Sequence, residues 1–317
     1  MLENHARLFD WCAGLEPRYL WLWPYDSGGC GCAKCRPWGS NGFLAVGEPL
    51  AALARDRLPG VQIVLSTWFF DDGEWRGLEG ALAGREPWFD YIMAEERWLA
   101  RPAMPGSVPA VGFPEISMHE TFPWGGFGAT PLTRRARSQW DAVKDRSAGG
   151  FPYSEGIYED VTKAVYAQLY WSDRAVDDTL REYIAFEYSP DVVDEVLEVI
   201  DTLERNHRFR WWPGKLEGVK LAQNWFPSRG AQPQADPGAE EAYAAMQRAD
   251  ARLPPRARRS WRWRQLYLRA LLDAELKGNG GRPNARCDEA FAELIEIYHA
   301  HNAEPHVRPP LPREPAP

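Results

Sequence analysis

The sequence lacks any apolar run approaching the ~20 residues needed to cross a bilayer. Its opening, MLENHARLFDW, has neither the basic segment nor the apolar stretch of a signal peptide, so the expected location is cytoplasmic unless truncation has removed a leader. It also lacks a basic surplus, since the formal net charge is -8. An acidic balance argues against binding driven by phosphate contacts. We therefore expect neither a membrane nor a nucleic acid as partner.

Several catalytic motifs are missing, namely a phosphate-binding loop, a dinucleotide fingerprint and a Gly-x-Ser-x-Gly elbow. Cysteine is scarce and odd in number, with five residues. In a reducing compartment this predicts free or metal-bound thiols rather than a disulfide framework. Aromatic residues are plentiful, with 16 Trp, 12 Tyr and 13 Phe. Aromatic faces pack against sugar rings as well as against each other, so the excess suits a saccharide site, although core packing explains most aromatics.

Strand-like and helix-like segments alternate from residue 1 to about 171, and 44% hydrophobic residues are enough for a sizeable core. Such alternation predicts a parallel sheet built from βα units. The polar, acidic and Gly-rich residues follow the strand-like runs, which places them at one face. The expected strands cover residues 18–23, 61–70, 89–94, 108–117 and 149–155.

About five βα units are present, whereas a closed (β/α)8 TIM-type barrel needs eight in roughly 250 residues. The predicted fold class is therefore α/β, a partial (β/α)8 barrel in which the first strand here is the fourth of a full barrel. Exposed sheet edges are a liability. This favours a fragment or truncated gene product, with an internal start or pairing of half-barrels between two chains as alternatives.

Beyond Trp171 the apolar residues recur at helical spacing. This predicts three regions: a partial barrel at 1–171 that is expected to be catalytic, an all-helical C-terminal domain at 172–304 and a Pro-rich disordered tail at 305–317. One expected helix carries its apolar stripe at Val192, Val193, Val196, Val199, Ile200 and Leu203.

Carboxylates after the expected strands are candidates for glycoside cleavage, which usually needs two carboxyl groups about 5–10 Å apart. Glu155, in PYSEGIYED, is the strongest candidate, and Glu115 and Asp26 follow it. Each has a structural alternative. Glu155 precedes a helix, where negative charge is favourable in any case. Glu115 lies in a Pro- and Gly-rich segment that also reads as a surface loop. Asp71, Asp72, Glu95 and Glu120 complete the strand-end acids.

Aromatic and polar side chains near these acids form the predicted substrate-binding set. The mixture of imidazole, carboxyl and aromatic groups suits general acid–base work and sugar stacking. For the tryptophans, core packing is the alternative. The set comprises Tyr25, Trp68, His119, Glu120, Trp124, Tyr153 and Tyr158.

Cys30, Cys32 and Cys35 form a C-x-C-x-x-C cluster, one ligand short of the usual structural zinc site. A fourth ligand could come from Cys12, Cys287, a histidine or Asp26. Free thiols packing a tight loop are the alternative. The expected cofactor is therefore at most a structural zinc, and glycosidase chemistry requires none.

The motifs YDSGGCGCAKC and SEGIYED, with the strands and helices around them, resemble a family. The resemblance is to bacterial glycoside-hydrolase-like barrels of the hexosaminidase and α-glucuronidase-like group, including domains in which an acid precedes a C-x-C-x-x-C loop. It covers nearly the whole chain as a second barrel half with appended helices, and it implies a TIM-type barrel that hydrolyses a glycosidic bond. Asp26-Ser27 stands where substrate-assisted hexosaminidases carry Asp-Glu, which argues against their chemistry.

Two other functions stay open beside a glycoside hydrolase acting on a poly- or oligosaccharide. One is a non-catalytic carbohydrate-binding protein on a degenerate barrel. The other is a metal-dependent hydrolase using the cysteine loop and His119. A homo-oligomer is also open, because a half-barrel exposes its sheet edges.

Overall fold

The structure, a computed structural model, describes residues 1–24, 30–99, 101, 103–117, 131–154, 158–206, 237–280, 282 and 284–297. The chain divides into two compact units. The sheet unit comprises Met1–Pro114 and Gln139–Phe151, and the helical unit comprises Glu115–Ser138 and Pro152–Pro317. The sequence-based division into folding domains, with a boundary near residue 171, stays a prediction.

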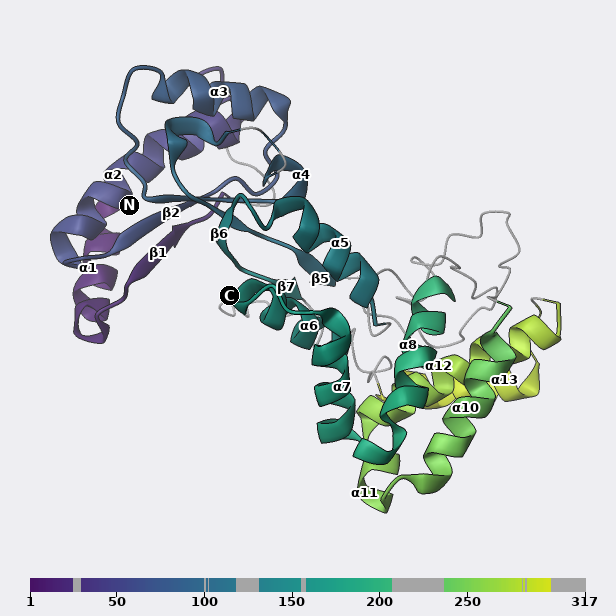
Figure 1. Cartoon of the computed structure of the whole chain (residues 1–317). Coiled ribbons are helices and arrows are strands. Elements are labelled where there is room, and N and C mark those ends of the chain that lie inside the picture. Colours follow the sequence, from purple (N-terminus) through teal and green to yellow (C-terminus); the bar gives the residue numbers. More distant parts are fainter. Residues whose placement is uncertain are drawn as a thin grey trace, which may run out of the picture. The chain divides into compact units, whose positions relative to one another are not determined.

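A five-stranded, wholly parallel sheet forms the centre of the sheet unit (Figure 1). Its order, β1-β2-β3-β4-β6, follows the chain, which is the winding of a (β/α) barrel. Four of the expected strand runs each contain one of these strands, and the run at 149–155 overlaps the end of the fifth. The predicted α/β fold class, a partial TIM-type barrel with a helical region after it, is therefore confirmed. The strands are β1 (Tyr19–Leu22), β2 (Gln62–Ser66), β3 (Tyr91–Ala94), β4 (Ala110–Gly112) and β6 (Ser147–Gly150).

Right-handed crossovers between neighbouring parallel strands place the connecting helices on one face of the sheet. Side chains alternate along β2 and β3, so Ile63, Leu65 and Ile92 share a face, and all three are fully buried. The other face carries Tyr19, which is exposed, and Trp21, which is half-buried. One face is thus aliphatic and covered, whereas the other carries the more open rings of β1 beside buried residues such as Val64 and Met93. The helices of this unit are α1 (Leu2–Cys12), α2 (Leu44–Arg57), α3 (Asp72–Leu82) and the short α4 (Glu96–Leu99).

Two of the predicted strands are each broken in two at the same tripeptide, Gly-Phe-Pro. It occurs at residues 112–114, after β4, and again at 150–152, after β6. Proline has no amide hydrogen to donate to a neighbouring strand, so each segment leaves the five-stranded sheet there. The two segments then pair with each other again as β5 (Glu115–Ser117) and β7 (Tyr153–Ser154), which form a separate two-stranded parallel sheet within the helical unit. The side chains of Phe113 and Phe151 lie against each other, with near-parallel rings 6.1 Å apart.

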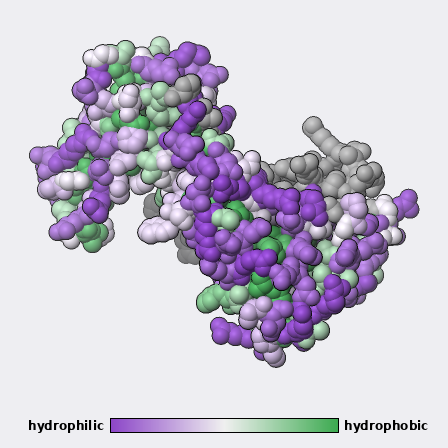
Figure 2. Space-filling view, viewed as in Figure 1, coloured by the Kyte–Doolittle hydropathy of each residue, from purple (hydrophilic) through white to green (hydrophobic). Residues whose placement is uncertain are grey.

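The helical unit packs amphipathic helices around shared apolar stripes. In α8, the expected stripe is present, since Val196, Val199, Ile200 and Leu203 are buried. Figure 2 shows that hydrophilic residues dominate the visible outer surface of these helices. None of the helices within the described ranges is long and apolar enough to span a membrane. Those after α5 (Thr133–Val143) are α6 (Asp160–Trp171), α7 (Val176–Glu187), α8 (Val193–Asn206), α10 (Ala239–Arg252), α11 (Pro255–Arg258), α12 (Trp261–Gly278) and α13 (Ala285–Ile297).

A buried ion pair within α12 belongs to a polar network that joins two helices of the helical unit. The Arg269 Nε of α12 donates to Asp273 Oδ1 at 3.0 Å, one helical turn away. Asn206, the last residue of α8, donates from Nδ2 to Asp273 Oδ2 at 3.1 Å. Since a buried charge is costly without a partner, this network ties α8 to α12 in one arrangement.

Candidate functional site

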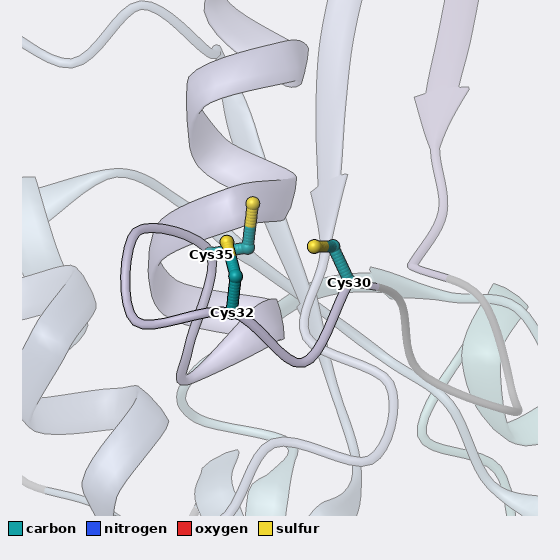
Figure 3. Close-up of side chains that lie close together, drawn as sticks. All are labelled: Cys30, Cys32 and Cys35. Atoms are coloured by element: carbon teal, nitrogen blue, oxygen red, sulfur yellow. The ribbon is translucent and has the colours of Figure 1, made fainter.

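The three clustered cysteines come together after β1 as the sequence predicts. The Sγ atoms of Cys30, Cys32 and Cys35 all lie within 4.8 Å of one another (Figure 3). Cys30 and Cys32 are exposed, and Cys35 is half-buried. Three sulfurs at this spacing could hold one thiophilic metal ion. We call residues 30–43, which carry these thiols, the thiol loop.

Local hydrogen bonds fix the backbone that carries the sulfurs. The amides of Cys35 and Arg36 both donate to the Cys32 carbonyl at 3.1 Å. The side-chain amide of Asn41 donates to the Lys34 carbonyl at 2.6 Å and to the Arg36 carbonyl at 3.1 Å. The turn is therefore closed by its own backbone and held from outside by one side chain.

The end of the thiol loop, Trp38–Phe43, is a π-helical turn that packs closely against the start of α3. Gly39 donates its amide to Glu74 Oε1 at 2.7 Å. Glu74 also accepts from the Asp71 amide, while Asp71 Oδ1 accepts from the Glu74 amide, which makes a capping box at the start of α3. A Cβ at Gly39 would lie 2.5 Å from the ring of Phe70, so only glycine fits here. The thiol loop is thus anchored to a rigid helix end.

The thiols differ in acidity because they hydrogen-bond to one another. A hydrogen bond from the Cys30 thiol, with further help from the backbone of Cys35 and Lys34, lowers the pKa of Cys32 to about 7. Its hydrogen bond to Cys32, followed by burial, raises the pKa of Cys35 to about 11. Near neutral pH, Cys32 therefore supplies a thiolate more readily than Cys35 does.

An aromatic cluster follows the strand ends of the sheet unit. Trp68 packs in it with ring centroids 4.5 Å from Phe69 and 5.0 Å from Phe113. Its exposed fraction is 7%, against 38% for Trp23, 54% for Phe69 and 46% for Phe151. The open aromatic faces at this edge therefore belong to Trp23, Phe69 and Phe151, with Trp68 packed behind them. The backbone of Phe69 has a φ of 59°, a strained conformation that non-glycine residues rarely adopt. Such strain often marks functional loops.

Part of the predicted site has a described backbone. Glu115 begins β5 and lies in register with Tyr153 on the parallel strand β7, so the two Cα atoms are neighbours. Glu155 comes directly after β7 in the sequence but lies outside the described residues, as do Tyr25, Asp26, His119, Glu120 and Trp124. Tyr158 is half-buried and packs edge-on against Trp261 at 5.3 Å, and burial raises its pKa.

A buried carboxyl group that sequence reasoning missed lies close to β7. The Glu159 side chain is fully buried, with Oε2 3.3 Å from Lys163 Nζ. The Ser154 hydroxyl donates to the same oxygen at 3.0 Å. This arrangement ties the end of β7 to the start of α6. The available signal was the i, i+4 spacing of Glu159 and Lys163 across a helix start, which is common on solvated helices and so was not distinctive.

Comparisons with known proteins support the fold. No protein-family model matches the sequence, and no curated protein matches it. Among solved structures, the chain is similar to a novel family GH115 4-O-methyl-α-glucuronidase, BtGH115A, with specificity for decorated arabinogalactans. The TM-score is 0.55 and the identity 11%, over 95% of this chain and 44% of that one. The chain thus spans less than half the length of that enzyme, and the likeness shows a shared fold alone.

Proposed function

We propose that this chain carries part of a glycoside hydrolase that acts on a poly- or oligosaccharide. The observation that carries the proposal is the likeness in fold to a 4-O-methyl-α-glucuronidase over 95% of the chain. Barrel enzymes place their catalytic groups at the carboxyl ends of the parallel strands. In this chain the acids and aromatic residues gather in the sequence after those same strand ends.

The proposed catalytic pair is Glu155 and Glu115. One carboxyl group would protonate the leaving oxygen, and the other would stabilise or attack the anomeric carbon. The parallel pairing of β5 with β7 supports this pair, because it places the backbone of Glu115 beside Tyr153, two residues before Glu155. Asp26, which follows β1, is the proposed binder of substrate hydroxyls or an alternative acid. No cofactor is needed for this chemistry.

The test is a screen of the purified chain against chromogenic glycosides and oligosaccharides, with α-glucuronides and arabinogalactan in the panel. We expect cleavage of at least one substrate and its loss in Glu155→Gln. Glu86→Gln is the matched control, because Glu86 is an exposed acid that precedes β3, at the other end of a strand. Cleavage that persists in Glu155→Gln would remove Glu155 from the mechanism.

A non-catalytic carbohydrate-binding protein is the second candidate. The exposed rings of Trp23, Phe69 and Phe151 favour it, because open aromatic faces pack against the C–H faces of sugars. Absence of cleavage across the panel, together with retardation of the protein in gels containing polysaccharide, would support binding without catalysis. Loss of retardation in Trp23→Ala would locate the contact.

A further inference from the structure

The thiol loop carries a second kind of chemistry that the glycosidase proposal does not use. We propose that Cys30, Cys32 and Cys35 bind one zinc-class divalent ion through three thiolates, with a fourth coordination position open to an exchangeable ligand, and that Asn41 positions these ligands. This inference does not rest on the glycosidase proposal.

The distances between the sulfurs fit a single ion. A Zn–S bond is about 2.3 Å, so the sulfurs of a tetrahedral site lie about 3.8 Å apart. The three Sγ atoms already lie within 4.8 Å of one another. Figure 3 shows the Cys30 sulfur directed toward the side chains of Cys32 and Cys35. Small side-chain rotations suffice to place all three around one ion.

The site has three protein ligands among the described residues. No further His, Cys, Asp or Glu from that part of the chain joins the group. Cys30 and Cys32 are exposed, so solvent reaches the ion and can supply the fourth ligand. Zinc sites with a position that solvent can reach bind water or a small ligand there.

Nearby cationic side chains partly offset the negative charge that three thiolates bring to this site. Binding releases the three thiol protons to solvent, and three thiolates with one divalent cation leave a net charge of about −1. Lys34 and Arg36 flank Cys35 in the sequence, and both are exposed. A cationic neighbour on each side lowers the cost of gathering three thiolates.

Asn41 provides the outer support that metal sites usually need. Its amide holds the Lys34 and Arg36 carbonyls, which bracket Cys35. Without the Asn41 side chain, the turn would keep the hydrogen bonds from the Cys35 and Arg36 amides to the Cys32 carbonyl. It would lose the two hydrogen bonds that connect it to the π-helical segment. Outer partners of this type typically change metal affinity about 10- to 100-fold.

The experiment uses the full chain, reduced and treated with chelator, and titrated with Co²⁺. We expect about one equivalent to bind, with a thiolate-to-cobalt charge-transfer band and the visible bands of four-coordinate Co²⁺, both abolished by Zn²⁺. Serine variants at Cys30, Cys32 and Cys35 should each lose the charge-transfer band or weaken binding strongly. Cys12→Ser and Cys287→Ser are matched controls and should bind normally.

A second measurement keeps the test independent of variant folding. In the unaltered protein, Zn²⁺ should protect Cys30, Cys32 and Cys35 from alkylation while leaving the reaction of Cys12 unchanged, as read by mass spectrometry. Absence of the cobalt bands, equal labelling with and without Zn²⁺, or a disulfide between two of the three in the reduced preparation would overturn the metal site.

The role of Asn41 has its own outcome. Asn41→Ala should weaken Co²⁺ binding about 10- to 100-fold while the saturated spectrum stays the same, because the ligands are unchanged. A purely structural role would instead lower the melting temperature of the metal-free protein and leave the affinity intact. That result would overturn the positioning role.

Discussion

The segments after β1 and β7 both follow parallel strands, yet they assemble their functional groups in different ways. After β1, three thiols separated by only five residues meet through a tight turn of their own backbone. Around β7, one pair comes from far apart in the sequence, since the backbone of Glu115 pairs with that of Tyr153 between parallel strands. The contacts of Glu159 with Ser154 and Lys163 are as local as those of the thiols. The difference teaches that the proposed metal site depends on local sequence, whereas the proposed carboxylate pair depends on strand pairing in the fold.

The largest effect is expected at the carboxylates. If Glu155 is the general acid or the nucleophile, Glu155→Gln should lower kcat/KM on a cleaved glycoside by about 100- to 10,000-fold. Proton transfer by a correctly positioned side chain contributes about that much to the rate. Simultaneous replacement of Cys30, Cys32 and Cys35 by serine should leave that rate within about twofold, since the thiols are not part of the proposed chemistry. A comparable loss in the cysteine variant would break the distinction between the two segments and favour a metal-dependent hydrolase.

A smaller but clear effect is expected where the thiol loop meets α3. Gly39→Ala should reduce the free energy of unfolding by about 1–3 kcal/mol, because the new Cβ would lie 2.5 Å from the Phe70 ring and 2.6 Å from Glu74 Oε1. Gly31→Ala is the matched control, since nothing lies within 4 Å of its added Cβ. Urea unfolding followed by circular dichroism would measure both. Equal stability of the two variants would show that the loop is not anchored at Gly39.

A second stability test concerns the end of β7, where Ser154 contacts Glu159. Ser154→Ala should cost about 1–2 kcal/mol, because it leaves the buried Glu159 oxygen without the hydroxyl donor at 3.0 Å. Ser172→Ala is the control, since the Ser172 hydroxyl accepts an exposed bond from Gln168 and its loss should change stability by less than about 0.5 kcal/mol. The same unfolding measurement applies. A neutral Ser154→Ala would mean that this hydroxyl does not stabilise the buried Glu159 carboxyl group.

The mildest prediction concerns thiol acidity in the metal-free protein. Alkylation of Cys32 should rise through pH of about 7 and then level off, because hydrogen bonds from Cys30 and the backbone of Cys35 and Lys34 stabilise its thiolate. Alkylation of Cys35 should still be rising at pH 9, since the pKa of that thiol is about 11. Rates of labelling for each cysteine across pH would measure this. Coincident midpoints would show that the thiols do not hydrogen-bond to one another in solution.

Much of the fold follows from the sequence. The largely apolar runs at 61–70 and 89–94 predict β2 and β3, because a buried parallel strand needs apolar side chains on both faces. The breaks at Pro114 and Pro152 were not predicted, although proline is the visible cause. A strand run that contains proline still reads as one strand until the partner strands are known.

For the candidate site, too, the sequence predicted some features and the tertiary structure decided others. The sequence alone determined the thiol cluster, since ligands two and three residues apart meet whenever the chain turns, and it determined the order of strands and helices through apolar periodicity. Only the tertiary structure decided that Trp68 packs behind open rings of Trp23, Phe69 and Phe151, that Glu115 lies beside Tyr153, and that Glu159 is buried. The physical reason is that burial and strand register arise from contacts between residues distant in sequence, which no local pattern specifies.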